Sequence, residues 1–154
     1  MFPRIEIAPH WKAVQLDLLA LLEMIPDERM DWSPKPELWN FRSILLHVAS
    51  ARQGWLDRGV KDGEQNLAWE NTPTKHDLRR AIDETWQRLQ RFIGNEIKLN
   101  DTYIVQWSDG TQDGPCSGHW VAFHLLEHDI HHRADVLHYL ALLGIDTSQT
   151  SINV

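Results

Sequence analysis

The chain has 154 residues, of which 42% are hydrophobic and 24% are charged, and its formal net charge at pH 7 is −7. A chain of this length and composition can bury a core in one globular domain, which excludes an intrinsically disordered or fibrous protein. Its lysines and arginines are scattered along an acidic chain, which argues against the phosphate contacts on which nucleic-acid binding depends.

Apolar residues recur at the spacing of an amphipathic helix in four segments, and the first two lie in the N-terminal part of the chain. The first stripe covers residues 11–25 and is stopped by Pro26. The second segment begins near Asn40, whose side chain is suited to cap a helix. It runs through Trp55 and ends before Gly59.

The third and fourth segments lie in the C-terminal part. The third begins after Thr74, which resembles a capping-box residue paired with Asp77, and ends near Gly94. The fourth covers residues 118–143, with Gly144 as its expected C-terminal cap. Together the four segments predict an all-α protein built as a four-helix bundle.

The connections between these segments differ in kind. Residues 101–106 alternate like a short strand, and a turn signal follows at Asp109-Gly110, so the sequence allows a short hairpin between the third and fourth helices. The polar residues after Asp146 show no periodicity and are expected to fray. We therefore expect a single helical bundle domain over residues 1–146 and a polar C-terminal tail over residues 147–154.

The sequence carries only a few features that bear on the cellular compartment of the protein. No apolar run reaches the length that crosses a membrane, and the acidic residues Asp17 and Glu23 interrupt the first apolar stretch. We therefore expect neither a secretory signal nor a membrane partner. The single cysteine, Cys116, cannot form an internal disulfide and fits a reducing cytoplasm. We expect it to be a plain buried cysteine rather than a reactive thiol.

Helical geometry separates the histidines of the last segment. At about 100° per residue, His128 and His132 lie beside the apolar face, whereas His124, His131 and His138 lie on an arc that is expected to face solvent. The imidazoles of His128 and His132 are one turn apart, so both can reach one metal ion at about 2.0–2.1 Å. His124 with His128 forms a competing pair, which the wheel disfavours.

A third candidate ligand, His47, lies within the apolar stripe of the second segment, between Ile44 and Ala51. A buried imidazole needs a polar partner, and a metal shared with His128 and His132 would satisfy all three rings. Alternatively, each ring is a core histidine bonded to a carbonyl or carboxylate. For the three together we favour a divalent metal site.

Several motifs along the chain carry a family resemblance. They are Trp32-Ser33-Pro34, Trp39, Ser43-Ile44-Leu45-Leu46-His47-Val48-Ala49, Glu127-His128-Asp129-Ile130-His131-His132-Arg133 and Leu140-Ala141-Leu142-Leu143-Gly144-Ile145. Over nearly the whole chain these residues resemble the DinB superfamily. In that family the last helix commonly reads His-Arg-Gly-Gln, where this chain has His132-Arg133-Ala134-Asp135. The ligand position is kept and the glutamine is replaced.

The resemblance implies a bundle of up-down-down-up topology with a metal site on the positions of His47, His128 and His132. It also implies zinc, nickel or a similar ion as the metal, and frequent homodimer formation. Related members include thiol-dependent transferases, and others have been described as metal-dependent hydrolases.

The chemistry open to such a site follows from its donors. Three neutral imidazoles leave coordination positions for water or a thiolate, so a bound metal could activate either one. We therefore predict a metal-dependent enzyme that acts on a small molecule, with a low-molecular-weight thiol as one candidate partner, by thiol transfer or hydrolysis. The alternative is a non-catalytic metal- or ligand-binding stress-response bundle. No side chain is assigned as the catalytic base.

Other residues near the candidate ligands have structural explanations as well. Asp129 or Asp135 could orient a ligand ring, but an ion pair of Asp129 with Arg133 one turn later is favoured. Trp107 and Trp120 are candidates to line the mouth of the site. Three further tryptophans lie on helical stripes and are expected in the core: Trp11, Trp55 and Trp86.

Overall fold

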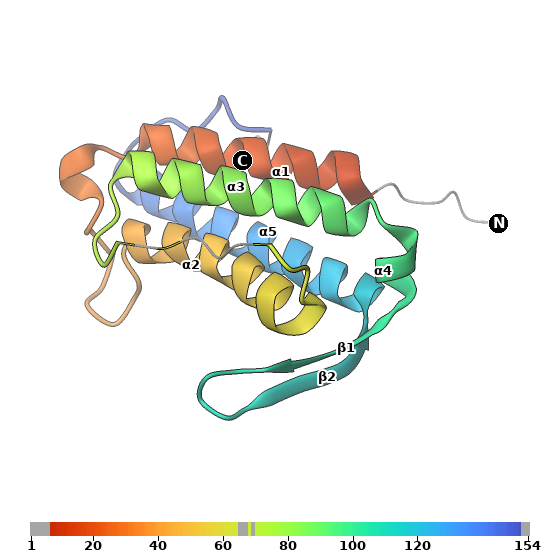
Figure 1. Cartoon of the computed structure of the whole chain (residues 1–154). Helices are drawn as coiled ribbons and strands as arrows, with labels where there is room; N and C mark the ends of the chain where they lie inside the picture. Colours follow the sequence, from red (N-terminus) through yellow and green to blue (C-terminus); the bar gives the residue numbers. More distant parts are fainter. Residues whose placement is uncertain (1–6, 65–67, 69, 152–154) are drawn as a thin grey trace.

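The computed structural model describes residues 7–64, 68 and 70–151, and most of them form helices (Figure 1). The four long helices are α1 (Ile7–Met24), α2 (Phe41–Gly54), α3 (Lys75–Ile93) and α5 (Gly118–Leu142). Helices α1 and α2 each pack against both α3 and α5. In Figure 1, α1 and α5 run from right to left, and α2 and α3 run from left to right. The predicted helical bundle is thus observed, with a small two-stranded sheet added to it.

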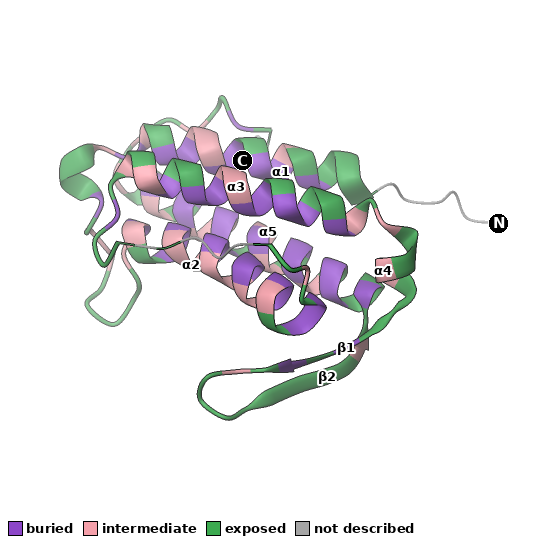
Figure 2. Cartoon of the chain, viewed as in Figure 1, coloured by how far each residue is buried: buried purple, intermediate pink, exposed green. Residues whose placement is uncertain are grey.

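Buried residues lie on the facing sides of the four long helices (Figure 2). The predicted stripes form this core, and the three tryptophans expected there are at most 7% exposed. Fully buried members from each long helix are Trp11, Leu18, Leu45, Val48, Leu78, Ile82, Leu125 and Val136. Among the described residues, no helix is both long enough and apolar enough to cross a membrane.

Side-chain caps fix where the long helices begin. The Asn40 side chain accepts a hydrogen bond from the Ser43 amide at 2.8 Å, at the start of α2. At the start of α3, Thr74 and Asp77 exchange the two hydrogen bonds of a capping box. These caps satisfy amides that have no partner within the helix, and both predicted starts are confirmed. Ser117 caps α5 in the same way.

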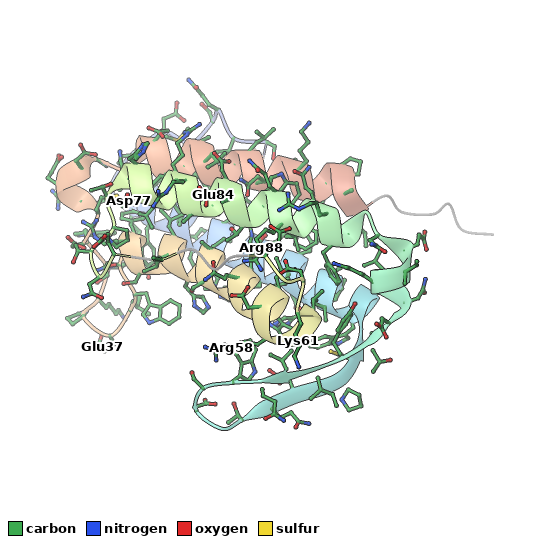
Figure 3. The ribbon with its side chains drawn as sticks, viewed as in Figure 1. Glu37, Arg58, Lys61, Asp77, Glu84 and Arg88 are labelled. Atoms are coloured by element: carbon green, nitrogen blue, oxygen red, sulfur yellow. The ribbon has the colours of Figure 1, made fainter. Side chains whose placement is uncertain are left out.

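The second helix ends differently from the prediction. The α-helix stops at Gly54 and continues as a single π-helical turn, η2 (Trp55–Val60). Arg88 of α3, labelled in Figure 3, holds this turn in place, because its guanidinium pairs with Asp57 at 2.6 Å and with Asp62 at 2.7 Å. The partners are distant in sequence, so helical periodicity within one segment does not reveal the change of winding.

The link between α3 and α5 contains a short helix and a hairpin. Helix α4 (Glu96–Asn100) was not predicted, whereas the hairpin was. Strands β1 (Thr102–Gln106) and β2 (Gln112–Ser117) are antiparallel, and Gln106 lies opposite Gln112. The hairpin packs on η2, where an added Cβ at Gly59 would lie 2.7 Å from Cγ2 of Val105. Glycine at this position therefore allows the close approach of β1.

The short helices and the tail complete the described chain. A 3-10 turn, η1 (Asp27–Arg29), follows α1. In the tail, the amide and hydroxyl of Ser151 donate hydrogen bonds to Asp17 at 2.8 and 2.6 Å. The expectation of a frayed tail is therefore wrong as far as residue 151, because a buried carboxylate of α1 holds it. Residues 152–154 lie outside the described residues.

The tightest backbone approach in the fold predicts a sensitive position. A Cβ at Gly118 would lie 2.2 Å from the carbonyl oxygen of Lys98 and 2.7 Å from Cα of Leu99. We expect Gly118→Ala to reduce the free energy of unfolding by about 1–3 kcal/mol, because α4 and α5 must separate. Urea denaturation monitored by circular dichroism measures the change.

The matched control for this variant is His119→Ala, at the next position of α5, where the side chain is exposed. We expect it to change stability by no more than about 0.5 kcal/mol. Equal unfolding midpoints for Gly118→Ala and the unmodified protein would contradict this account of the junction.

Candidate metal centre

The three histidines singled out by the sequence lie together between α2 and α5. His47 comes from the middle of α2, and His128 and His132 come from successive turns of α5. Their ring centroids are 4.8 Å (His47 to His128), 5.1 Å (His47 to His132) and 4.5 Å (His128 to His132) apart. One ring nitrogen of each lies within 4.8 Å of the other two. A single ion could therefore contact all three.

The state of His128 shows that this cluster fits a metal. Both of its ring nitrogens are buried, and neither has a hydrogen-bond partner within the described structure. Its Nδ1 lies 3.9 Å from Oδ1 of Asp129, which is too far for a hydrogen bond. A buried polar atom without a partner costs about 1–3 kcal/mol, so an ion bound here would relieve a real deficit.

The surroundings favour the neutral form of the imidazoles. Burial, together with the nearby rings of His128 and His132, lowers the pKa of His47 to about 4. Burial and the charge of His128 also lower the pKa of His132, although Asp135 opposes this shift. Neutral imidazole is the form that binds a metal, so these two donors need not lose a proton at neutral pH.

Asp135 orients one of the three rings. Its Oδ2 lies 3.1 Å from Nδ1 of His132, which leaves Nε2 of that ring for an ion. The suggestion that Asp135 holds a ligand ring is supported by this contact. A second group of possible metal donors, made of His131, His132 and Asp135, shares His132. Its His131 side chain is 69% exposed, so this group is the less enclosed of the two.

Trp39 covers the cluster on one side, a position that the sequence analysis did not assign. Its ring lies 4.7 Å from the ring of His47 and 6.1 Å from that of His132, nearly parallel to the latter. The residue directly precedes Asn40, the cap of the helix that carries His47. The sequence offered two signals for this role: Trp39 belongs to the motifs that carry the family resemblance, and it stands beside the cap of a helix that carries a histidine.

A buried ion pair lies behind the cluster. Nη2 of Arg52 lies 2.7 Å from Oδ2 of Asp129, and both side chains are fully buried. Nε1 of Trp11 donates to the same carboxylate oxygen at 2.7 Å. Nη1 of Arg52 donates to Oε1 of Gln15 and to the carbonyl oxygen of Ile82. The pair therefore joins α2 to α5 with supporting bonds from α1 and α3.

This arrangement corrects the ion pair expected between Asp129 and Arg133. Arg133 instead binds Asp17 of α1, with 2.8 Å between Nη1 and Oδ2. The helical spacing of Asp129 and Arg133 suggested a local pair, but both side chains point into the bundle, where partners from other helices surround them. Long-range contacts therefore replaced the local one.

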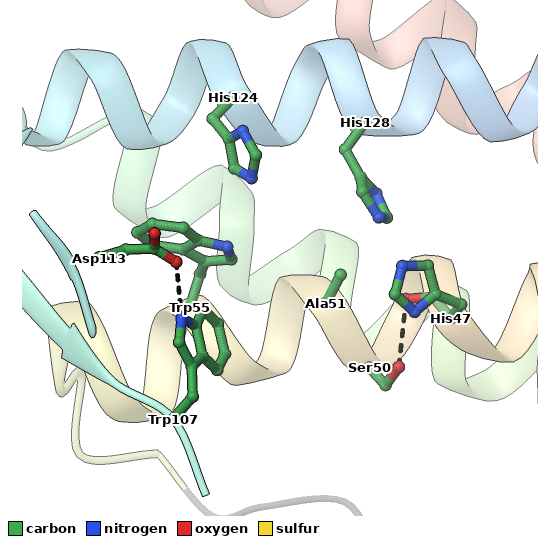
Figure 4. Close-up of a pocket in the computed structure, with 8 residues that line it drawn as sticks. All are labelled: His47, Ser50, Ala51, Trp55, Trp107, Asp113, His124 and His128. Carbon is green, nitrogen blue, oxygen red and sulfur yellow. Dashed lines mark hydrogen bonds between the residues drawn. The ribbon is translucent and has the colours of Figure 1, made fainter. Parts of the chain in front are cut away.

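A cavity of about 370 Å³ opens beside the cluster. Figure 4 shows its lining residues, which are His47, Ser50, Ala51, Trp55, Trp107, Asp113, His124 and His128. Trp107 thus lines the mouth as predicted, and the ring of Trp55 contributes although that residue is only 4% exposed. Trp120 lies outside this lining and stacks on His124, with 5.0 Å between ring centroids.

The environment of His124 differs from the prediction. We expected this side chain to face solvent, but it is partly buried, and Trp55 lies 5.2 Å from its ring. A helical wheel of α5 takes no account of neighbouring elements, and here the hairpin and η2 cover the part of the helix that carries His124. By contrast, burial raises the pKa of the Cys116 thiol, in agreement with the expectation of an unreactive cysteine.

The buried ion pair yields a stability prediction. Replacing Arg52 by methionine leaves the carboxylate of Asp129 buried without its cation, so we expect a loss of about 3–5 kcal/mol in the free energy of unfolding. The control is Arg91→Met, which removes an exposed arginine that pairs with Glu64. That change should cost at most about 1 kcal/mol. Similar losses in the two variants would show that the buried pair has no special role.

The low pKa of His47 yields a pH prediction for the metal-free protein. Between pH 6.5 and about 4, the unfolded chain protonates His47 while the folded chain does not. Protons therefore favour the unfolded state, and stability should fall as the pH drops through this window. Chemical denaturation at several pH values measures the slope, which should be smaller in His47→Gln. Identical slopes in both proteins would contradict the low pKa.

Comparison with known proteins identifies the family to which the chain is similar. The model of the DinB family matches residues 1–153 of the chain. A search of the curated proteins found no match.

Solved structures share the fold. A candidate member of the DinB family from Exiguobacterium sibiricum is 19% identical with a TM-score of 0.68, covering 96% of this chain and 92% of that chain. A DinB-like protein from Bacillus subtilis is 17% identical with a TM-score of 0.70, covering 91% and 93%. A DinB-like protein from Bacillus cereus is 14% identical with a TM-score of 0.66, covering 91% and 92%.

Proposed function

Because the chain belongs to the DinB family, we propose that it is a metal-dependent enzyme that holds one divalent ion on His47, His128 and His132. The observation that carries the proposal is the pair of buried, unpartnered nitrogens of His128 at the centre of a three-histidine cluster. Zinc or nickel suits this set of imidazole donors. The directions of the four long helices also fit the up-down-down-up order that the family resemblance implies.

The number of donors favours catalysis over a structural role. Among the described residues, the cluster consists of three histidines, whereas structural zinc sites have four protein ligands. Three ligands leave a position for water or substrate, and the cavity lined by His47 and His128 gives access to it. A site of this kind supports chemistry on a small molecule.

The chain's own residues would prepare the site for that chemistry. When bound, the ion would supply a Lewis acid that activates water for hydrolysis or a thiol for transfer. His47 and His132 offer neutral nitrogens, because burial lowers the pKa of each ring. Asp135 holds the ring of His132, and Trp39 shields one side of the cluster. Substrate would approach from the cavity on the side of His47 and His128.

We also propose a homodimer and a cytoplasmic location. Large apolar side chains remain exposed on α1 and α5, including Leu16 at 56% and Leu142 at 68% exposure, and a second copy could cover them. The partner that we propose is a small-molecule substrate, with a low-molecular-weight thiol as one candidate and with thiol transfer and hydrolysis both kept open. The alternative function is a non-catalytic metal- or ligand-binding stress-response bundle.

Metal content tests the proposed site. The protein is purified without chelator or a nickel column, loaded with zinc, and subjected to elemental analysis. We expect one ion per chain, lost in His128→Ala. The control is His131→Ala, which removes a donor only from the exposed group that shares His132. Loss of the ion in His131→Ala with retention in His128→Ala would assign the metal to that other group.

Activity measurements separate the enzyme from the binding protein. The zinc-loaded protein is assayed for conjugation of small thiols to an electrophilic dye and for hydrolysis of an activated ester. We expect one of these rates to exceed that of His128→Ala. Bound metal with no turnover of either class would favour the non-catalytic alternative.

A further inference from the structure

Aromatic rings form the wall of the cavity away from the histidine cluster. Trp55 and Trp107 meet edge to face, with 5.5 Å between their ring centroids. The ring of His124 lies 5.2 Å from that of Trp55 on the other side. Figure 4 shows these three rings at one end of the cavity and His47 and His128 at the other. The cavity therefore has an aromatic end and a metal-binding end.

A carboxylate stands beside the aromatic end. Asp113, from β2, accepts a hydrogen bond from Nε1 of Trp107 at 2.6 Å, which fixes the carboxylate against the indole (Figure 4). Among the described residues that line the cavity, it is the only acidic one, and none of them is lysine or arginine. Arg58 is not among the residues that line the cavity; its charge contributes instead to lowering the pKa of Asp109, in the turn of the hairpin.

Histidine does not neutralise this carboxylate at neutral pH. Burial and the charge of His128 lower the pKa of His124, against the opposing effects of Glu127 and Asp113. The ring is therefore neutral at pH 7 and presents an aromatic surface rather than a cation. The aromatic end of the cavity thus combines three aromatic rings with a negative charge.

We propose that the aromatic end, made of Trp55, Trp107, His124 and Asp113, binds an alkylammonium group of the substrate. A cation is attracted by the faces of indole rings and by a carboxylate at the same time. This inference rests on the proposed function, because the reacting part of the same molecule would lie toward His47 and His128. It also predicts that an anionic group binds poorly at this end of the cavity, since neither lysine nor arginine is among the described residues that line it.

Choline and its uncharged isostere, in which a tert-butyl group replaces the trimethylammonium group, test the proposal. The two compounds have nearly the same shape and differ in charge. Binding is followed by titration of the indole N–H signals in NMR spectra, with Trp107 assigned through Trp107→Phe. We expect choline to bind at least about fivefold more tightly than the isostere.

Two aspartate variants locate the effect. Asp113→Asn removes the charge and keeps an oxygen that can accept the hydrogen bond of Trp107, so it should abolish the preference for choline. Asp109→Asn removes a charge from the same hairpin outside the lining and can still accept the hydrogen bonds of Thr111. It should retain the preference. The proposal is overturned if the isostere binds as tightly as choline, if neither compound binds, or if both variants behave alike.

The outcome of this test does not depend on whether the protein binds a metal. The titrations are made with metal-free and with zinc-loaded protein, because the aromatic end shares no residue with the three proposed ligands. A preference for choline in protein that fails to take up zinc would support the cation site and reject the metal site. Zinc uptake with no preference for choline would do the reverse.

Discussion

The buried ion pair of Arg52 and Asp129 is the interaction on which the rest of the structure depends. Removing both charges from water is costly, and the cost is offset only when every remaining hydrogen-bonding position finds a partner. Trp11 and Gln15 of α1 and the Ile82 carbonyl of α3 provide those partners. All four long helices are thereby tied to one point. Because Arg52 lies five residues after His47, and Asp129 directly follows His128, the same point sets the spacing of the histidines.

Other buried arginines and aspartates also join separate elements of the fold, farther from the centre of the bundle. Arg88 holds η2 against α3, and Asp17 gathers Arg133 and the tail onto α1. Each pairing joins elements that are far apart in sequence. Since η2 carries Trp55 and supports the hairpin, the contact at Arg88 indirectly shapes the cavity beside the histidines.

The two sides of the histidine cluster differ in their lining: His47 and His128 line the cavity of about 370 Å³, whereas His132 lines a second cavity of about 330 Å³ together with Trp39 and Asp135. Trp39 covers one side with an aromatic ring that is still 51% exposed. The other side opens into the larger of these two cavities, whose far end is aromatic and acidic. In our proposals the aromatic end of the cavity recognises the substrate and the histidine end holds the ion, and α5 contributes one histidine to each end, His124 and His128.

The sequence by itself determined the long helices, two of their caps, the hairpin and the three histidines, because these depend on periodicity and on neighbours within a few residues. Only the tertiary structure decided which side chains from different helices become partners. Asp129 has a nearby arginine one turn away but pairs with Arg52, and His124 lies on the predicted solvent arc but is enclosed by η2 and the hairpin. The π-helical turn and the docking of Ser151 on Asp17 belong to the same class. In each case the partner is remote in the chain, and a buried charge or ring takes the partner that packing brings to it rather than the one that sequence places beside it.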